Sequence, residues 1–176
     1  MTTEYLLQRE IDNILSVLTP GNALVIRVAL HTGLRISDCL SLKTDQLSSR
    51  FWITEGKTGK RKQIGLPQPL LNDLKNSAGK IWVFEGVNPQ KHRSRQAVWK
   101  DVKRAADAFR LKQNVAPHSM RKVYAVELRK KYGDFEKIKR NLNHSSLAVT
   151  MIYAIADQQL ESKSKRRRPA AGRKAV

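Results

Sequence analysis

The stretch that decides the fold is Gly21-Asn-Ala-Leu-Val-Ile-Arg-Val-Ala-Leu-His31, which is apolar on almost every side. A helix that is apolar all round is typical of a protein interior. Thr19 and Pro20 precede it, and they supply the capping residue and the first-turn proline with which helices commonly begin. The sequence therefore predicts a core helix over residues 21–31.

Further helices are predicted on both sides of this core helix. Between Tyr5 and Leu18, apolar residues recur at steps of three and four, which is the period of a helix with one apolar face. Gly33 interrupts the core helix. The segment from Arg35 to Leu42 then predicts a short third helix with four residues turned inward, Ile36, Cys39, Leu40 and Leu42.

The hydrophobic period changes after residue 50. Residues 51–54 and 62–66 predict two short strands, and the segment 55–60 between them contains two glycines that suit a hairpin turn. We expect a helix over 69–76, a third strand over 80–84 and a polar loop over 85–93.

The second half of the chain is predicted to be helical. Ser94 caps a long helix that runs to Leu111 and has one apolar face, made by Val98, Val102, Ala105 and Phe109. Helices follow over residues 118–132, over 134–141 and from Ser145 or Ser146 through Tyr153. The predicted fold class is α+β, mostly helical, with a small antiparallel sheet of about three strands.

Charge indicates the kind of partner. The chain has 176 residues, of which 34 are Lys or Arg and 15 are Asp or Glu, for a net charge of +19. A length of this order suits one domain, which we place at residues 1–160, with a flexible basic tail at 161–176. The tail holds seven of the basic residues and one acid, so the body is strongly basic by itself. This pattern favours nucleic acid as the partner. The alternatives are a ribosomal-type RNA binder and a protein that is merely soluble and cationic.

Composition also bears on the compartment. The longest apolar stretch, Ala23 to Leu30, is broken by Arg27 and is far shorter than the ~20 residues that span a bilayer, so we expect no membrane partner. The N-terminus lacks the pattern of a secretory signal, and the single Cys39 cannot form an internal disulfide. We therefore expect an intracellular, cytoplasmic protein. The histidines and the cysteine lack the paired spacings of a structural zinc site.

Six polar residues in chain order make a coherent set for phosphoryl transfer: Arg35, Lys57, His118, Arg121, His144 and Tyr153. Two guanidinium groups can bind the non-bridging oxygens of a phosphodiester and offset the charge that grows in its transition state. A tyrosine hydroxyl can attack phosphorus, a histidine can manage its proton, and a lysine can protonate the leaving oxygen. No carboxylate cluster suited to Mg²⁺ accompanies the set, so we expect chemistry without metal or other cofactor.

Four segments resemble the catalytic domain of tyrosine recombinases, the phage integrase family, and the resemblance runs from about Glu4 to Ala156. They are His31-Thr-Gly-Leu-Arg-Ile-Ser-Asp38, Gly56-Lys-Thr-Gly-Lys60 with Ile64 to Pro67, Pro117-His-Ser-Met-Arg121, and Leu142-Asn-His-Ser-Ser146 followed by Tyr153. Each motif is weak by itself, but their order and the His-to-Tyr step are specific. The resemblance implies the fold of the family's catalytic core.

The resemblance also implies roles. Arg35 and Arg121 would clamp the scissile phosphate, and His118 would act as general acid and base. His144 would donate a hydrogen bond to a phosphate oxygen. Tyr153 would be the nucleophile, forming a 3′-phosphotyrosine link and freeing a 5′-hydroxyl, so that rejoining needs no ATP.

Two supporting positions follow from the same resemblance. Lys57 resembles the hairpin lysine that protonates the leaving 5′-oxygen, although Lys60 is close enough to compete for this role. Asp38 matches an acidic position that supports the active site. Asn143 stands where the family usually has glycine, which is tolerable because asparagine also adopts left-handed backbone.

The larger departure is that no N-terminal core-binding domain precedes the matching segments. Either the sequence is a catalytic domain taken from a longer protein, or it is a naturally minimal recombinase. The basic tail would either pack on a neighbouring protomer or trail along DNA.

The function that the resemblance implies is a site-specific DNA recombinase, an integrase or invertase. It would act on double-stranded DNA with a specific site, as a homotetramer, with a monomer in solution left open. The alternatives are a type IB topoisomerase-like enzyme and a non-catalytic DNA-binding protein. Further DNA contacts are expected from basic residues near the motifs: Lys60, Arg61, Lys62, Arg93, Arg95 and Lys122.

Overall fold

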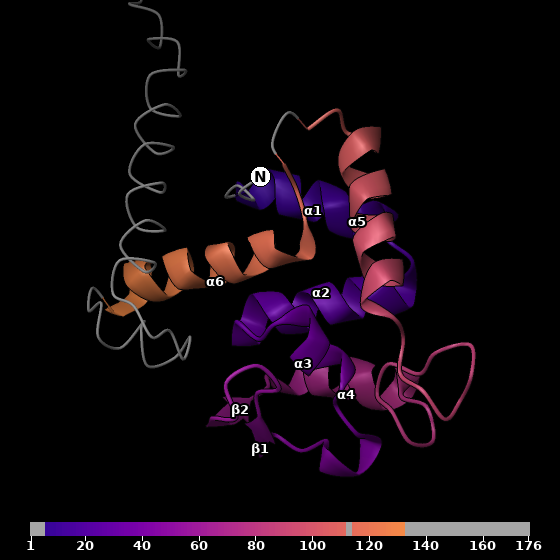
Figure 1. Ribbon diagram of the computed structural model, residues 1–176. Coiled ribbons are helices and arrows are strands. Elements are labelled where there is room, and N and C mark those ends of the chain that lie inside the picture. The colour runs from indigo at the N-terminus through magenta and orange to yellow at the C-terminus, as the bar shows by residue number, and fades with distance from the viewer. Residues whose placement is uncertain (1–5, 112–113, 133–176) are drawn as a thin grey trace, which may run out of the picture.

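The computed structural model describes residues 6–111 and 114–132. In these ranges the chain forms helices and one two-stranded sheet (Figure 1). In chain order the elements are α1 (Gln8–Val17), α2 (Pro20–Thr32), α3 (Ile36–Leu40), the 3-10 helix η1 (Thr44–Gln46), β1 (Arg50–Thr54), β2 (Arg61–Gly65), α4 (Gln68–Ser77), α5 (Arg95–Ala108) and α6 (Pro117–Tyr132).

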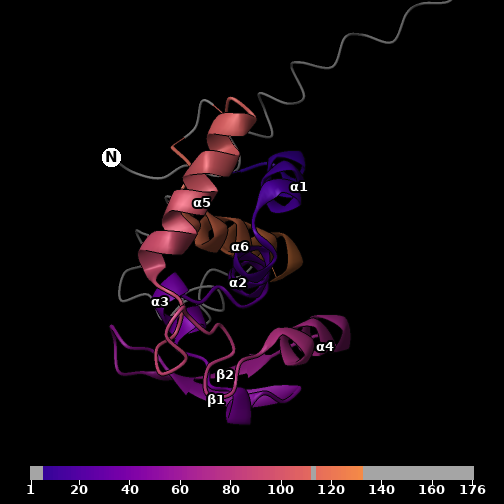
Figure 2. The ribbon, with the colours of Figure 1, turned by 90° about the vertical axis from the view of Figure 1, so that its right-hand side faces the viewer.

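Helix α2 lies at the centre, as the sequence predicted. It contacts each of the other five α-helices in the described part of the chain. Figures 1 and 2 show α1, α5 and α6 on one side of it, and α3, α4 and the hairpin β1-β2 on the other. Its apolar residues are buried all round the helix: Leu24, Val25, Ile26, Val28 and Ala29.

The start of α2 is held by a residue distant in sequence. Thr19 does not cap the helix with its own side chain. Instead its N–H and its hydroxyl both donate to Oδ2 of Asp101 on α5, at 3.0 and 2.9 Å, and Asn22 Nδ2 donates to the same oxygen at 2.7 Å. One buried carboxylate therefore joins the start of α2 to α5. These hydrogen bonds outweigh the effect of burial and lower the pKa of Asp101 to about 2.

The sheet differs from the prediction in its number of strands. Strands β1 and β2 pair in antiparallel register, with Phe51 opposite Ile64 and Ile53 opposite Lys62. The third strand predicted over residues 80–84 is wrong. Trp82 makes an isolated bridge with Lys43, and its carbonyl accepts the Gly79 N–H at 3.0 Å, so the segment is folded into a tight turn and cannot extend a ladder.

The ends of the helices account for a second difference. Val98, Val102 and Ala105 are buried on α5 as predicted, but Phe109 is exposed. The helix ends at Ala108, one residue before Phe109, so the apolar face predicted to reach Leu111 stops short. The two helices predicted over 134–141 and through Tyr153 lie outside the described residues.

Candidate active site

The first arginine of the predicted set is presented by a sharp corner after α2. Gly33 ends the helix with a φ of 66°, a conformation that favours glycine. A Cβ at this position would overlap the ring of Tyr124 on α6. Arg35 follows two residues later, at the N-cap position of α3. The corner therefore fixes the position from which the Arg35 side chain extends.

Two cationic side chains donate hydrogen bonds to backbone carbonyls of this corner. Arg121 on α6 donates from Nη1 to the carbonyl of Gly33 at 2.7 Å, and Lys62 on β2 donates from Nζ to the carbonyl of Thr32 at 2.7 Å. Arg121 is buried, with 2% of its surface exposed. A buried guanidinium with a fixed backbone partner is a rigid group, so the second predicted arginine is held in place by the backbone that carries the first.

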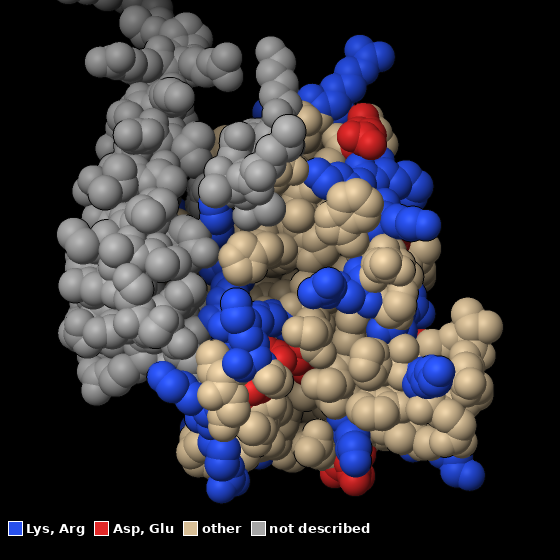
Figure 3. All heavy atoms as spheres, viewed as in Figure 1, with Lys and Arg blue, Asp and Glu red and all other residues tan. Residues whose placement is uncertain are grey.

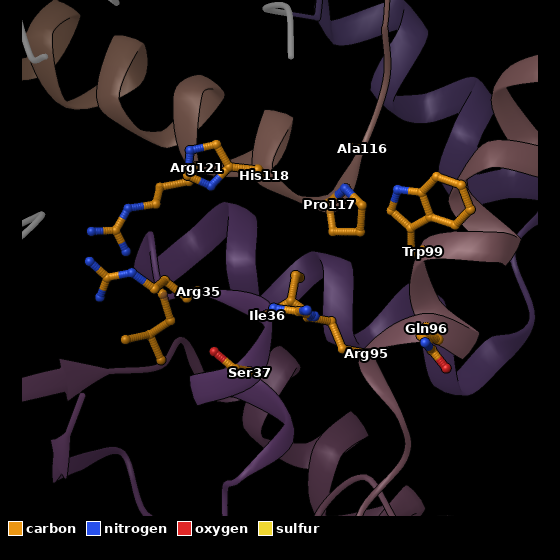
Figure 4. Close-up of a pocket in the computed structure, with 11 residues that line it drawn as sticks. Arg35, Ile36, Ser37, Arg95, Gln96, Trp99, Ala116, Pro117, His118 and Arg121 are labelled. Carbon is orange, nitrogen blue, oxygen red and sulfur yellow. The ribbon is translucent and has the colours of Figure 1, made fainter. Parts of the chain in front are cut away.

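The two arginines line one hollow with His118 (Figure 4). Its volume is about 430 Å³, and its walls come from the start of α3, the first turns of α5 and the start of α6. Figure 4 shows the guanidinium groups of Arg35 and Arg121 directed to the same side of the hollow. The remaining lining residues include Arg95, Gln96 and Trp99 of α5. The fold thus brings together three of the six predicted catalytic residues.

Carboxylates balance these cations. Arg35 Nη1 donates to Oε2 of Glu55 at 2.6 Å and lies 3.9 Å from Oδ2 of Asp38. Asp38 also accepts the N–H of Gly56 at 3.1 Å, through Oδ1. Asp38 therefore contacts the active-site arginine and the hairpin at once. Glu55 was not predicted as a site residue. It is the one acidic residue between Arg50 and Lys62, and a single acid in such a basic segment is the signal that could have indicated it.

His118 is set to be neutral at neutral pH. Its pKa is lowered first by desolvation, since part of the ring lies against protein although the residue keeps access to solvent. Neighbouring cations lower it further: Arg121, Lys122, Arg35 and Lys57. A neutral imidazole can accept a proton, as a general base must.

The hairpin turn brings Lys57 into this electrostatic environment. The turn is closed by backbone hydrogen bonds from the Glu55 N–H to the Lys60 carbonyl, at 3.0 Å, and from the Gly59 N–H to the Glu55 carbonyl, at 2.8 Å. Gly59 has a φ of 65°. Lys57 is exposed at the tip, and its charge reaches His118.

The six residues expected to contact DNA have different surroundings. Lys60, Arg61 and Arg95 are exposed, and the guanidinium of Arg61 lies 5.2 Å from the ring centroid of Trp52. Lys122 is half-buried near His118. Figure 3 shows Lys and Arg side chains gathered near the middle of this face.

The other two of these residues have partners inside the protein. Arg93 donates from Nη1 to Asn22 Oδ1 at 2.9 Å. Lys62 is held on the Thr32 carbonyl, and burial, followed by the charge of Arg121, lowers its pKa to about 8. His144, Tyr153 and Asn143 lie outside the described residues.

Within 6–111 and 114–132, no three His, Cys, Asp or Glu side chains gather so as to hold a metal ion. In the same part of the chain, no helix is long and apolar enough to cross a membrane.

Two arginines and a histidine around one hollow form a group of side chains that is chemically suited to binding a phosphodiester and accepting a proton. The chain is a member of the phage integrase family, whose family model matches residues 4–159.

Individual relatives agree with this assignment. The chain is 30% identical over 135 residues to the probable integrase/recombinase YoeC of Bacillus subtilis, covering 73% of this chain and 74% of the relative. It is 30% identical over 170 residues to a tyrosine recombinase of Thermosipho africanus, covering 89% of this chain and 59% of the relative.

A solved structure shares the fold. The XerH site-specific recombinase, in a post-cleavage complex with palindromic difH substrate, superposes with a TM-score of 0.72 at 21% identity, over 93% of this chain and 53% of that one. The chain therefore spans about half to three quarters of the length of these relatives.

Proposed function

We propose that this chain is the catalytic domain of a site-specific DNA recombinase that cleaves and rejoins DNA through a 3′-phosphotyrosine intermediate at Tyr153. The observation that carries the proposal is the convergence of Arg35, Arg121 and His118 on one hollow. Family membership and the DNA-bound state of the XerH relative support DNA as the substrate.

In the proposed reaction the two guanidinium groups bind the non-bridging oxygens of the scissile phosphate. The Tyr153 hydroxyl attacks phosphorus and its proton passes to His118, whose pKa is lowered by desolvation and then by the neighbouring cations, so that the imidazole is ready to accept it. The bond from phosphorus to the 5′-oxygen breaks, and a lysine protonates this leaving oxygen. His144 completes the set of phosphate donors.

Lys57 is our candidate for the lysine that protonates the 5′-oxygen. It is exposed at the tip of the hairpin turn, and its charge lowers the pKa of His118. A substrate with sulfur in place of the bridging 5′-oxygen tests the assignment, because a thiolate leaves without a proton. Lys57→Met should slow cleavage of normal DNA and recover on the thio substrate. Recovery of Lys60→Met instead would reassign the role.

A DNA duplex nicked near the cleavage site traps the covalent intermediate and tests the whole proposal. The wild-type protein should form a DNA adduct that resists denaturant. Tyr153→Phe should form none, while the control Tyr132→Phe should react normally. An adduct with Tyr153→Phe would overturn the assignment, and the absence of any adduct with wild type would favour a non-catalytic DNA-binding protein.

Site dependence separates a recombinase from a topoisomerase-like enzyme. A recombinase should require its own site, whereas equal relaxation of any supercoiled plasmid would favour the type IB alternative. Exchange between two duplexes cuts four strands, and one nucleophile per chain then calls for four copies on DNA. We therefore also propose a homotetramer, which the mass of the assembled complex would test.

Duplex backbone contacts are proposed for the exposed cations Lys60, Arg61 and Arg95 and for the half-buried Lys122. Each phosphate contact removed should reduce the slope of log affinity against log salt by about 0.9. Arg93 serves as the control, because its guanidinium is bound to Asn22. We further propose residues 1–160 as the catalytic domain, 161–176 as a basic tail, and the cytoplasm as the place of action.

A further inference from the structure

We propose that Glu55 is a positioning residue for the reaction proposed above: its buried carboxylate holds Arg35 and ties the Lys57 hairpin to that arginine. The inference rests on the proposed function and adds a residue to it. Glu55 stands directly after β1 and before the turn that carries Lys57.

The backbone of Glu55 is fixed at both of its polar groups. Its N–H donates to the Lys60 carbonyl and its own carbonyl accepts the Gly59 N–H, so this one residue closes the hairpin turn. A contact that restrains the Glu55 side chain therefore also restrains the position of the turn and of Lys57 at its tip.

The side chain of Glu55 reaches Arg35 and the turn simultaneously. None of the residue is exposed to solvent. Oε2 accepts from Arg35 Nη1 at 2.6 Å and from the hydroxyl of Thr58 at 3.1 Å. Thr58 follows Lys57 in the chain. The carboxylate thus links the arginine after the α2 corner to the residue next to the hairpin lysine, across 20 positions of sequence.

Glu55 is charged at neutral pH in spite of its burial. Desolvation raises its pKa, but hydrogen bonds from Arg35 and Thr58 and the charge of Arg121 outweigh it, so that the pKa is lowered. A negative charge thus lies close to both arginines that would bind the phosphate. It offsets their mutual repulsion before DNA arrives. The bond from Arg35 to Glu55 uses one of the five N–H donors of the guanidinium, which leaves geometric capacity for a phosphate.

The second carboxylate oxygen argues against a purely stabilising ion pair. Among the described residues, Oε1 of Glu55 is buried without a hydrogen-bond partner. Leaving a buried acceptor unpaired has a free-energy cost, and stability alone would favour pairing both oxygens. An unpaired Oε1 is consistent with a Glu55 carboxylate whose main effect is to orient Arg35 and the turn through Oε2.

The test compares Glu55→Gln with wild type in two separate measurements. Single-turnover formation of the covalent adduct on the nicked duplex should slow by about tenfold or more, since the amide keeps the shape but loses the charge that orients Arg35. DNA affinity, measured by fluorescence anisotropy, should change by less than about threefold, because Arg35 itself remains. Glu127→Gln, which removes an exposed carboxylate from α6, is the matched control and should alter neither.

Glu55 would affect the cleavage rate in two ways, through the hairpin that carries Lys57 and through Arg35, and these two effects can be measured separately. On the 5′-thio substrate, the defect of Glu55→Gln should shrink, because the Lys57 proton is no longer needed, and should not vanish, because Arg35 is still displaced. Thr58→Val removes one hydrogen bond at an exposed turn. It should slow cleavage about twofold in the wild-type background and have no further effect beside Glu55→Gln.

The positioning role is overturned if Glu55→Gln forms the adduct at the wild-type rate. It is also overturned if rate and DNA affinity fall together with the unfolding midpoint, which would mark Glu55 as structural. If Glu55→Gln fails to fold, a rate for Thr58→Val equal to wild type is itself sufficient to reject the coupling. Failure of the proposed function gives a different result, since wild type would then form no adduct.

Discussion

Replacing Lys62 with methionine should remove a rise in stability that the wild-type protein shows between about pH 8 and pH 10.5. Lys62 donates to the Thr32 carbonyl and lies with Nζ 5.5 Å from the ring centroid of Tyr124. Burial, followed by the charge of Arg121, lowers its pKa from 10.5 to about 8, against the opposing charge of Glu55. The folded protein therefore releases this proton at a lower pH than the unfolded chain does.

The size of the effect follows from proton linkage. Between these two pKa values the unfolded state binds more protons than the folded state, so the free energy of unfolding increases with pH. Each pKa unit corresponds to about 1.4 kcal/mol, which gives about 3 kcal/mol over the whole window. Below pH 8 the folded protein carries a buried ammonium and this stabilisation is absent. Above 10.5 the lysine is neutral in both states and the gain is complete.

Urea unfolding of wild type and Lys62→Met at several pH values between 7 and 10.5 measures the effect. The hydrogen bond lost with Lys62 changes stability by an amount nearly independent of pH, whereas the linkage contribution varies, so the difference between the two proteins should move by about 3 kcal/mol across the range. Lys60→Met, at an exposed position of the same hairpin, should differ from wild type by a constant. A constant difference for Lys62→Met as well would refute the reasoning.

Three further substitutions test the fold around the site. Asp101→Asn should cost about 2 kcal/mol at pH 7, and should remove the part of the acid loss of stability that Asp101 contributes as pH falls from 3.8 towards 2, because the carboxylate pKa is lowered to about 2 in the folded state; acid unfolding measures both. Gly33→Ala should cost about 2 kcal/mol or more by thermal unfolding, since alanine is strained at a φ of 66° and its Cβ would overlap Tyr124; an unchanged midpoint would contradict the corner described. Leu74→Ala, at a fully buried position of α4, should cost about 3 kcal/mol, whereas Val87→Ala at an exposed position should be neutral; equal urea midpoints for these two variants would count against the packing.

The sequence predicted the elements whose cause is local. The core position of α2 follows from its apolar composition on every side, and the hairpin follows from two strand patterns around Gly56 and Gly59. Of the predicted active site, Arg35, Arg121 and His118 come to line one hollow because each stands at or near a helix start or corner that the pattern of glycine and proline already marks.

Contacts between segments that are distant in the chain could not be predicted from the sequence. The carboxylate that binds Thr19 comes from Asp101, 82 residues away, and the partner of Arg35 is Glu55, 20 residues away. Residues 80–84 have the composition of a strand, but their neighbours in space allow only the bridge between Trp82 and Lys43. Local propensity cannot report such pairings, because they depend on tertiary context.

The net charge of +19 agrees with the proposed DNA partner, yet it obscures how the site is arranged. Attraction to DNA would be strongest with cations alone. The structure instead places Glu55 and Asp38 beside Arg35, and it holds Arg121 and Lys62 on backbone carbonyls. Unpaired arginines at close range would repel one another and sample many rotamers. The free energy of DNA binding would then have to offset the cost of ordering them. Acidic partners weaken the long-range attraction slightly and fix the guanidinium groups beforehand, which is the arrangement that favours transition-state stabilisation over simple affinity.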